Sequence, residues 1–261
     1  MLLKNKIAVI YGAGGYVGRT VAKAFAKEGA KVFLIGQTFE KVHMLANEII
    51  LDGGYAEAAK VDALNQKEVE EHLSTIVTAH QRVDISFNLI GIDDVQGMQL
   101  TEMEVEQFFM PVEKAMRSQF ITATAAAKIM KSNSGGVILM LSANAAKKPF
   151  ENLGGFGIAC AAMEALSRQL AVELGRHGIR VVCLRSAGSP DAAGVSQVFD
   201  EHAALKSQSR EEFERQFAET TMLKHLPALA EVANVTVLMA SDKASPVTAA
   251  IINVTCGELA D

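Results

Sequence analysis

The chain has 261 residues, of which 49% are hydrophobic and 21% are charged, and its formal net charge is −5. This length and this balance are typical of one large folded domain and exclude an intrinsically disordered chain. The negative net charge, without any long basic run, argues against general nucleic-acid binding. We therefore expect no nucleic-acid partner. No apolar run is long enough to cross a membrane, so we expect no membrane partner either.

Short apolar runs rich in β-branched residues alternate with longer segments of helical periodicity. Strands are predicted at residues 6–11, 31–35, 57–61, 85–90, 137–141, 179–184 and 250–254. Helices are predicted at residues 17–28, 39–51, 67–80, 102–131, 157–175 and 231–241, the fourth of them broken near Pro111. Apolar strands that alternate with helices predict a parallel sheet covered on both faces. With right-handed crossovers this is a doubly wound, Rossmann-type α/β fold of about seven strands in three layers, a single domain over residues 1–261.

Residues 194–224 depart from this alternation, because they carry a polar, mixed-charge helical pattern after the sixth predicted strand. One interpretation is a solvated helical hairpin. The other is a lid over the site, since ligands of such sheets bind at the carboxyl ends of central strands. We favour the substrate lid.

Cysteine and histidine usage bears on metal binding and on location. Cys160, Cys183 and Cys256 are scattered without CxxC spacing, which predicts reduced thiols rather than disulfides or a zinc site. The six histidines show no HxxxH or HxH spacing, so we expect no metal. The first predicted strand begins too early to leave room for a signal peptide. We therefore expect a cytoplasmic protein.

A glycine-rich turn joins the first predicted strand to the first predicted helix at residues 12–18. Gly12 allows the tight turn, Gly14 or Gly15 lets the backbone approach a pyrophosphate, and Gly18 lets the helix pack on the strand. The free N–H groups and the positive dipole end of the helix face the phosphates. The turn therefore predicts dinucleotide binding by Gly12, Gly14, Gly15, Tyr16, Val17 and Gly18.

The residues after the next strands bear on which dinucleotide is bound. Gln37 and Thr38 follow the second strand, where an acidic residue would bind the ribose hydroxyls of NAD. Because no carboxylate is present to repel a 2′-phosphate, we favour NADP over NAD and expect Gln37 to contact the cofactor. Asp62 is expected to meet the adenine, and Asn88 and Gly91 the ribose. The alternatives for these three are a helix N-cap, a strand-end turn residue and a turn glycine.

At this point the chain resembles the short-chain dehydrogenase/reductase family over nearly its whole length. The matching segments are residues 12–18, 61–62, 88–91, 136–142, 159–174, 178–181 and 240–245. The glycine spacing GxxGxxG is similar to that of the family's extended branch, whereas the length is similar to that of its ordinary branch. The resemblance implies an NAD(P)-dependent oxidoreductase that acts on a carbonyl or alcohol substrate. It also implies a homodimer or a homotetramer.

The same resemblance implies a catalytic set that this chain only partly carries. The family uses a Tyr as general acid/base, a Lys four residues later, a substrate-orienting Ser and an Asn on the preceding helix. Ser142 matches the family Ser. Counting back from residues 170–174 puts Phe156 at the Tyr position and Cys160 at the Lys position, with the Asn position near Ala115. A phenyl ring donates no proton, and a thiol does not replace an ammonium group.

A shifted register does not restore the set. The longer spacing of the related enoyl reductases puts Leu153 at the Tyr position, and the only tyrosines are Tyr11, Tyr16 and Tyr55. Two hypotheses follow. The first is an oxidoreductase whose proton comes from Ser142, a loop lysine or water. The second is a non-catalytic dinucleotide-binding protein that acts as a sensor or partner subunit.

Charged and polar residues near the predicted pocket leave further alternatives open. Arg185 lies at the carboxyl end of the sixth strand, where it could bind a carboxylate or a cofactor phosphate, or pair with an acidic residue such as Asp191. Asn144, Lys147 and Lys148 follow Ser142 in a loop that would border the pocket. Any of the three could replace the lost proton donor, although a solvated loop is the simpler interpretation.

Overall fold

A computed structural model of the chain describes residues 1–133 and 135–260. Within these residues, seven parallel strands form one sheet in the order β3-β2-β1-β4-β5-β6-β7. The strands are β1 Ile7–Tyr11, β2 Lys31–Gly36, β3 Tyr55–Lys60, β4 Ile85–Asn88, β5 Gly136–Ala143, β6 Ile179–Ser186 and β7 Ala250–Val254. The predicted doubly wound Rossmann-type fold is confirmed, with each strand end within two residues of its predicted position.

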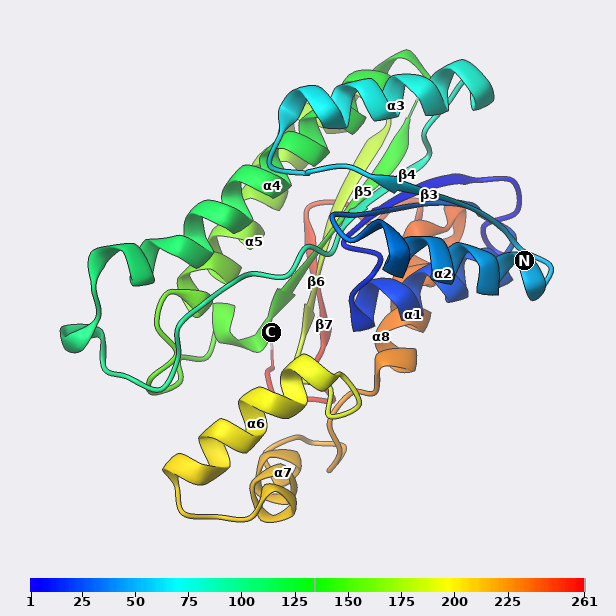
Figure 1. Cartoon of the computed structure of the whole chain (residues 1–261). Coiled ribbons are helices and arrows are strands. Elements are labelled where there is room, and N and C mark those ends of the chain that lie inside the picture. The colour runs from blue at the N-terminus through cyan, green and yellow to red at the C-terminus, as the bar shows by residue number, and fades with distance from the viewer. Residues whose placement is uncertain (134, 261) are drawn as a thin grey trace.

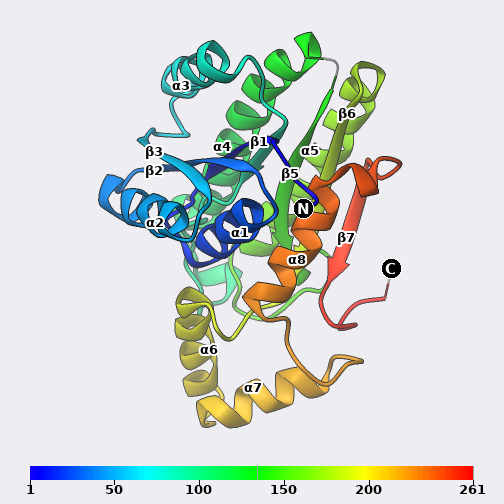
Figure 2. The same cartoon turned by 90° about the vertical axis from the view of Figure 1, so that its right-hand side faces the viewer.

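Helices cover both faces of the sheet and give the three layers visible in Figures 1 and 2. The helices are α1 Tyr16–Lys27, α2 Phe39–Leu51, α3 Gln66–His80, α4 Val105–Ser132, α5 Phe156–Leu174, α6 Ala193–Leu205, α7 Arg210–Glu219 and α8 Leu229–Ala240. Alternate residues of the buried strands point into two separate cores. In β1, Ala8 and Ile10 pack with α1, α2 and α8, whereas Val9 and Tyr11 pack with α3, α4 and α5.

The predicted break at Pro111 is wrong, because α4 is one continuous helix. A capping box fixes its start: the side chain of Gln107 accepts the N–H of Glu104 at 3.0 Å. Proline has no backbone N–H, so one helical hydrogen bond is missing at Pro111. Its buried ring lies so close to α5 that a side chain at Gly155 would overlap it. Packing against α5 thus offsets the local preference for a break.

The segment predicted as an insert forms α6 and α7, which lie beside the carboxyl edge of the sheet, apart from the three layers (Figures 1 and 2). The rings of Phe199, Phe213 and Phe217 hold these helices together, with centroid separations of 5.5, 5.6 and 6.2 Å. The insert therefore has a small aromatic core of its own. Across the described part of the chain, no helix is both long and apolar enough to cross a membrane.

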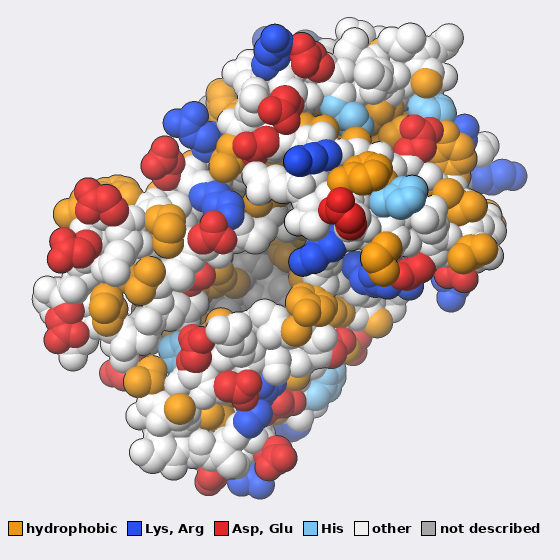
Figure 3. Space-filling view, in the orientation of Figure 1, with side chains coloured by type: hydrophobic (Ala, Val, Ile, Leu, Met, Phe, Trp, Pro, Cys, Tyr) orange, Lys and Arg blue, Asp and Glu red, His pale blue; other side chains and the backbone are white. Residues whose placement is uncertain are grey.

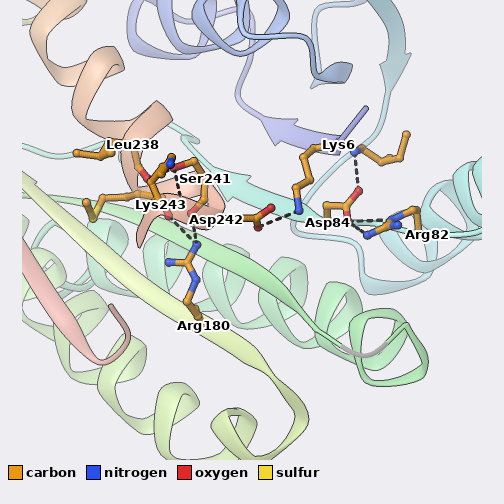
Figure 4. Close-up of polar contacts among 10 residues, drawn as sticks. Lys6, Arg82, Asp84, Arg180, Leu238, Ser241, Asp242 and Lys243 are labelled. Atoms are coloured by element: carbon orange, nitrogen blue, oxygen red, sulfur yellow. Dashed lines mark hydrogen bonds and ion pairs between the residues drawn. The ribbon is translucent and has the colours of Figure 1, made fainter. Parts of the chain in front are cut away.

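The amino edge of the sheet is closed by polar contacts (Figure 4). The guanidinium of Arg180, near the start of β6, donates to the carbonyl oxygens of Met239 at 2.9 Å and Ser241 at 3.2 Å. These carbonyls belong to the end of α8, where helical partners run out. The buried carboxylate of Asp84 accepts the N–H of Ile7 at 2.8 Å. These contacts join the amino ends of β1 and β6 to neighbouring segments.

Candidate dinucleotide and substrate site

A cavity of about 1220 Å³ opens at the carboxyl edge of the sheet. Its lining runs from the glycine turn and the end of β2, past the ends of β4, β5 and β6, to α6 and α7. Figure 3 shows it as a hollow in the surface above α6. One continuous space therefore connects the predicted dinucleotide turn with the predicted lid.

The glycine turn has the geometry that dinucleotide binding requires. Gly12 has a φ of +74°, and a side chain there would overlap the backbone at Leu89. A side chain at Gly18 would overlap the carbonyl of Gly12, so both positions require glycine. Gly15 is the N-cap of α1 and no side chain caps that turn, which leaves its N–H groups facing the cavity. A bound phosphate group is what such an N-terminus favours.

Gln37 and Asp62 meet across the ends of β2 and β3. The Gln37 Nε2 donates to Asp62 Oδ1 at 3.1 Å, and both residues line the cavity. The same Asp62 oxygen accepts the N–H of Leu64 at 3.0 Å, which holds the carboxylate in place. Lys41 lines this end as well. A carboxylate therefore lies beside Gln37 although none follows β2 in the sequence.

Asn88 ends β4 and holds the loop that follows it. Its Oδ1 accepts the N–H of Ile90 at 3.0 Å, and its Nδ2 donates to Thr122 Oγ1 at 3.0 Å. Asn88 is buried, so these bonds fix the path of the backbone toward Gly91. Both residues line the cavity, and a side chain at Gly91 would meet no atom within 4 Å.

Ser142 belongs to a buried polar cluster beneath the cavity. Its Oγ donates to Glu164 Oε1 at 2.8 Å, while Arg185 binds both oxygens of the same carboxylate at 2.7 Å. The exposed fraction of each of the three residues is 6% or less. The partner of Arg185 is thus Glu164 on α5 rather than Asp191, which instead accepts the N–H of Leu229 at 3.1 Å.

The face of α5 toward the cavity is apolar. Phe156, Cys160 and Met163 line it. Burial raises the pKa of the Cys160 thiol to about 12, so this thiol stays protonated and uncharged at neutral pH. None of the three side chains therefore carries a charge near pH 7.

The loop after β5 is fastened to the C-terminal tail. Asn144 Nδ2 donates to Glu258 Oε2 at 2.6 Å, and Lys148 Nζ binds Glu258 Oε1 at 2.9 Å. The Glu258 side chain is fully buried. Lys147 Nζ donates to the carbonyl of Ala260 at 2.6 Å. Both loop lysines thus contact the tail; Lys147 is exposed, as the solvated-loop interpretation expected, whereas Lys148 lines the cavity.

A hydrogen-bonded chain that the sequence did not reveal joins the loop after β4 to α6. Gln96 Nε2 donates to Asp94 Oδ2 at 2.6 Å, and Gln96 Oε1 lies 3.0 Å from His202 Nε2. All three line the cavity. Burial raises the pKa of the Asp94 carboxyl and lowers the pKa of the His202 imidazole. The cavity therefore holds one carboxyl group that keeps its proton to a higher pH than usual.

Comparison with known proteins identifies the family. The family model described as "Enoyl-(Acyl carrier protein) reductase" matches residues 12–258. The chain belongs to the short-chain dehydrogenase/reductase family. Secoisolariciresinol dehydrogenase of Forsythia intermedia is 30% identical over 254 residues, which cover 94% of this chain and 86% of that protein. The 7alpha-hydroxysteroid dehydrogenase of Escherichia coli (strain K12) is 29% identical over 255 residues, 98% of this chain and 94% of that one.

Two solved structures have closely similar folds. A 7 alpha-hydroxysteroid dehydrogenase complexed with NADH and 7-oxo glycochenodeoxycholic acid gives a TM-score of 0.85 at 25% identity, covering 99% of this chain and 96% of that one. An NAD+-bound xylitol dehydrogenase gives 0.91 at 18% identity, covering 98% and 100%. The second likeness supports the fold alone. Both agree with the seven-stranded sheet described above.

Proposed function

We propose that this short-chain dehydrogenase/reductase binds NADP(H) or NAD(H) along the carboxyl edge of its sheet and transfers hydride between that cofactor and a carbonyl or alcohol substrate under α6 and α7. The observation that carries the proposal is the single cavity that joins an uncapped glycine turn to a lid-like helix pair. The complex of the related 7 alpha-hydroxysteroid dehydrogenase with NADH and a 7-oxo compound supports it.

The cofactor would be held by residues along the strand ends. The pyrophosphate would lie against the turn formed by Gly12, Gly14, Gly15, Tyr16, Val17 and Gly18 and would take its free N–H groups. The N–H of Gly15 is not one of these, because it donates to the carbonyl of Gly12 at 3.1 Å. Gln37 and Asp62 would bind the adenosine, and Asn88 and Gly91 the second ribose. When bound, the nicotinamide supplies or accepts the hydride.

A preference for NADP(H) rests on the charges beside Gln37. The ammonium of Lys41 at this end of the cavity attracts a 2′-phosphate, whereas the carboxylate of Asp62 repels it. The second strand ends without an acidic residue of its own. We therefore keep NADP(H) as the proposed cofactor, with NAD(H) as the weaker ligand.

Asp94 is the proposed proton donor for carbonyl reduction. By the count along the chain, Phe156 and Cys160 occupy the positions of the family's Tyr and Lys. The Ser142 hydroxyl donates its hydrogen bond to Glu164. Ser142 is accordingly proposed to orient the site from beneath rather than to move the proton. Asp94 lines the cavity with a raised pKa and lies in a loop that is tied to α6. A carboxyl with a raised pKa keeps its proton over a wider pH range and can donate it to a developing alkoxide.

The test pairs Asp94→Asn with Asp52→Asn in hydride-transfer assays that use deuterated cofactor and a panel of ketones. Asp52 is exposed at the C-terminal end of α2 and does not line the cavity, so its variant is the matched control. Loss of a general acid lowers kcat about 10²–10⁴-fold. The reduction rate of the unmodified chain is expected to fall as pH rises through the pKa of Asp94, which burial raises most, the Gln96 hydrogen bond lowers, and Asp93 and Glu201 raise slightly.

Three outcomes separate the parts of the proposal. Equal rates for the two variants would overturn the role of Asp94 alone. Failure to bind either cofactor at millimolar concentration would overturn the proposed function. Tight cofactor binding without turnover of any substrate would favour a sensor or partner subunit. This is the second candidate function, because Phe156 is apolar and Cys160 is uncharged. In that case Phe156→Tyr with Cys160→Lys is expected to create activity on simple ketones.

A homodimer or homotetramer formed through α4 and α5 is proposed as the assembly. Large apolar side chains stay exposed on these helices: Phe120 at 56%, Ile158 at 54% and Val172 at 78%. Exposed apolar side chains on two adjacent helices are suited to pairing with a second copy. A monomeric mass in light scattering would contradict this assembly.

A further inference from the structure

A cluster of three side chains with metal-binding chemistry lies outside the dinucleotide and substrate site. His225 Nδ1 lies 3.6 Å from Cys256 Sγ and 3.9 Å from Glu231 Oε2. These three donor atoms all lie within 4.8 Å of one another. They come from separate segments: the chain after α7, the first turn of α8, and the tail after β7. Convergence of a nitrogen, a sulfur and an oxygen donor from three segments calls for an explanation.

We propose that His225, Glu231 and Cys256 form a binding site for one Zn²⁺ ion, with water as its fourth ligand. Imidazole, thiolate and carboxylate are the three donor types that zinc takes in proteins. Tetrahedral zinc with bonds of about 2.0–2.3 Å separates its ligand atoms by about 3.3–3.8 Å. The two short separations already approach this range, so the ion requires only small side-chain movements.

The backbone holds the donors in place without an ion. The N–H of Leu223 donates to the carbonyl of Cys256 at 3.1 Å, and the N–H of Met222 donates to the carbonyl of Gly257 at 3.3 Å. Glu231 is fixed because its Oε2 accepts the N–H of Ala228 at 2.8 Å. Such outer contacts orient a metal ligand and strengthen the site.

Cys256 has a φ of +53°, in the left-handed region. Side chains other than glycine, asparagine and aspartate are uncommon there, so this position is unfavourable for a cysteine that has only a packing role. The side chains of His225 and Glu231 are 48% and 51% exposed, which lets an ion enter from solvent. Because zinc would bind Nδ1 of His225, the ring proton must lie on Nε2. The Nδ1–zinc bond would replace the present 3.1 Å contact between Nδ1 and the carbonyl of Leu226.

The position of the site gives the ion a structural consequence. His225 follows the end of the lid segment, and Cys256 lies two residues before Glu258, which holds Asn144 and Lys148 at the cavity wall. An ion shared by His225, Glu231 and Cys256 therefore clamps the base of the lid to the tail. Bound zinc is expected to slow exchange of the backbone amides in residues 220–226 and 255–258.

The first experiment titrates the full chain with Co²⁺, a spectroscopic substitute for zinc. One equivalent is expected to bind and to give the near-ultraviolet charge-transfer band of a Co²⁺–thiolate bond, which Zn²⁺ then abolishes. Loss of an outer-shell partner costs about 10–100-fold in affinity, so Cys256→Ser and His225→Gln are expected to weaken zinc binding by at least about 100-fold. His43→Gln, at an exposed histidine on α2, is the matched control and is expected to bind as the unmodified chain does.

A second variant keeps the test decisive if the serine variant folds poorly. Cys256→Gly suits the left-handed backbone and is expected to raise the melting temperature in the absence of metal. The same variant is expected to show no zinc-dependent rise in melting temperature and no zinc-dependent slowing of amide exchange. A thiolate band that persists in the Cys256 variants, or no binding at a tenfold molar excess of metal, would overturn the site. Binding without slower exchange at residues 220–226 would overturn the clamp.

Discussion

The two ends of β6 each carry an arginine, and the two are used differently. Arg180, at the amino end, donates to carbonyl oxygens of Met239 and Ser241 where α8 ends. Arg185, at the carboxyl end, binds the buried carboxylate of Glu164 directly beneath the cavity. The first arginine supports a helix end, whereas the second supplies a charge pair that shapes the floor of a site.

This difference follows from the direction of the helices. Each helix that returns from one parallel strand to the next runs against the strands, so its N-terminus lies at the carboxyl edge of the sheet and its C-terminus at the amino edge. C-termini expose carbonyl oxygens, which attract cations such as Arg180. N-termini expose N–H groups, which attract anions. The amino edge is therefore filled by the protein's own cations, and the carboxyl edge is left to accept a ligand.

The largest expected effect is at the carboxyl end. Glu164→Ala leaves the buried Arg185 guanidinium without its bidentate partner, and breaking such a pair costs about 3–5 kcal/mol of the free energy of unfolding. Urea denaturation followed by circular dichroism measures the loss. Glu164→Met with Arg185→Met removes both charges and is expected to stay within about 1 kcal/mol of the unmodified chain. A double variant as unstable as Glu164→Ala would show that the pair itself stabilises the fold.

The next effect is at the amino end. Arg180→Met removes three hydrogen bonds to carbonyl oxygens, those of Met239, Ser241 and Val247. Hydrogen bonds to charged groups contribute about 1.5–3 kcal/mol, and water can replace part of them because Arg180 is only half-buried. We expect a loss of about 2 kcal/mol in the same denaturation experiment, with unchanged cofactor affinity. A larger loss than that of Glu164→Ala would reverse the ranking of the two ends.

The sheet could be predicted from the sequence, because most of its strands are largely apolar and the glycine turn follows the first of them. The break predicted at Pro111 is absent because packing of its buried ring against α5 outweighs one missing hydrogen bond. The signal for Glu164 in the sequence was its position as the one charged residue in the otherwise apolar run at residues 156–166 of α5. It lies 21 residues from Arg185, so the pairing itself is a product of the fold.

The remaining site contacts depend on segments that are far apart in the chain. Gln96 and His202 are 106 positions apart, and no pattern in the sequence links the two side chains. Glu258 likewise reaches Asn144 across 114 residues through the position of the tail. Local motifs therefore predicted where a dinucleotide would bind, whereas the groups around the substrate end required the three-dimensional structure.

A third, smaller effect tests the link between an open N-terminus and function. Gly15→Asp adds a side-chain cap and a negative charge to the first turn of α1, where a side chain would make only ordinary contact with Gly12. We expect a gain of about 0.5–1 kcal/mol in the free energy of unfolding without cofactor. The same carboxylate competes with the pyrophosphate, so NADPH affinity is expected to fall at least tenfold in fluorescence titration. Gly15→Asn is the control, because it adds a cap without the charge.

The smallest effect is at the amino edge, where Lys6 Nζ lies 3.0 Å from Asp242 Oδ1. The Asp242 side chain is 83% exposed, so water and salt screen this pair. A double-mutant cycle with Lys6→Met and Asp242→Asn is expected to give a coupling of only about 0.3 kcal/mol, which vanishes at high salt. A coupling that matched the buried pair of Arg185 and Glu164 would mean that burial does not set the energetic difference between the two ends. A small, salt-sensitive coupling would support burial as the reason why the Arg185–Glu164 pair matters more for stability than the exposed Lys6–Asp242 pair.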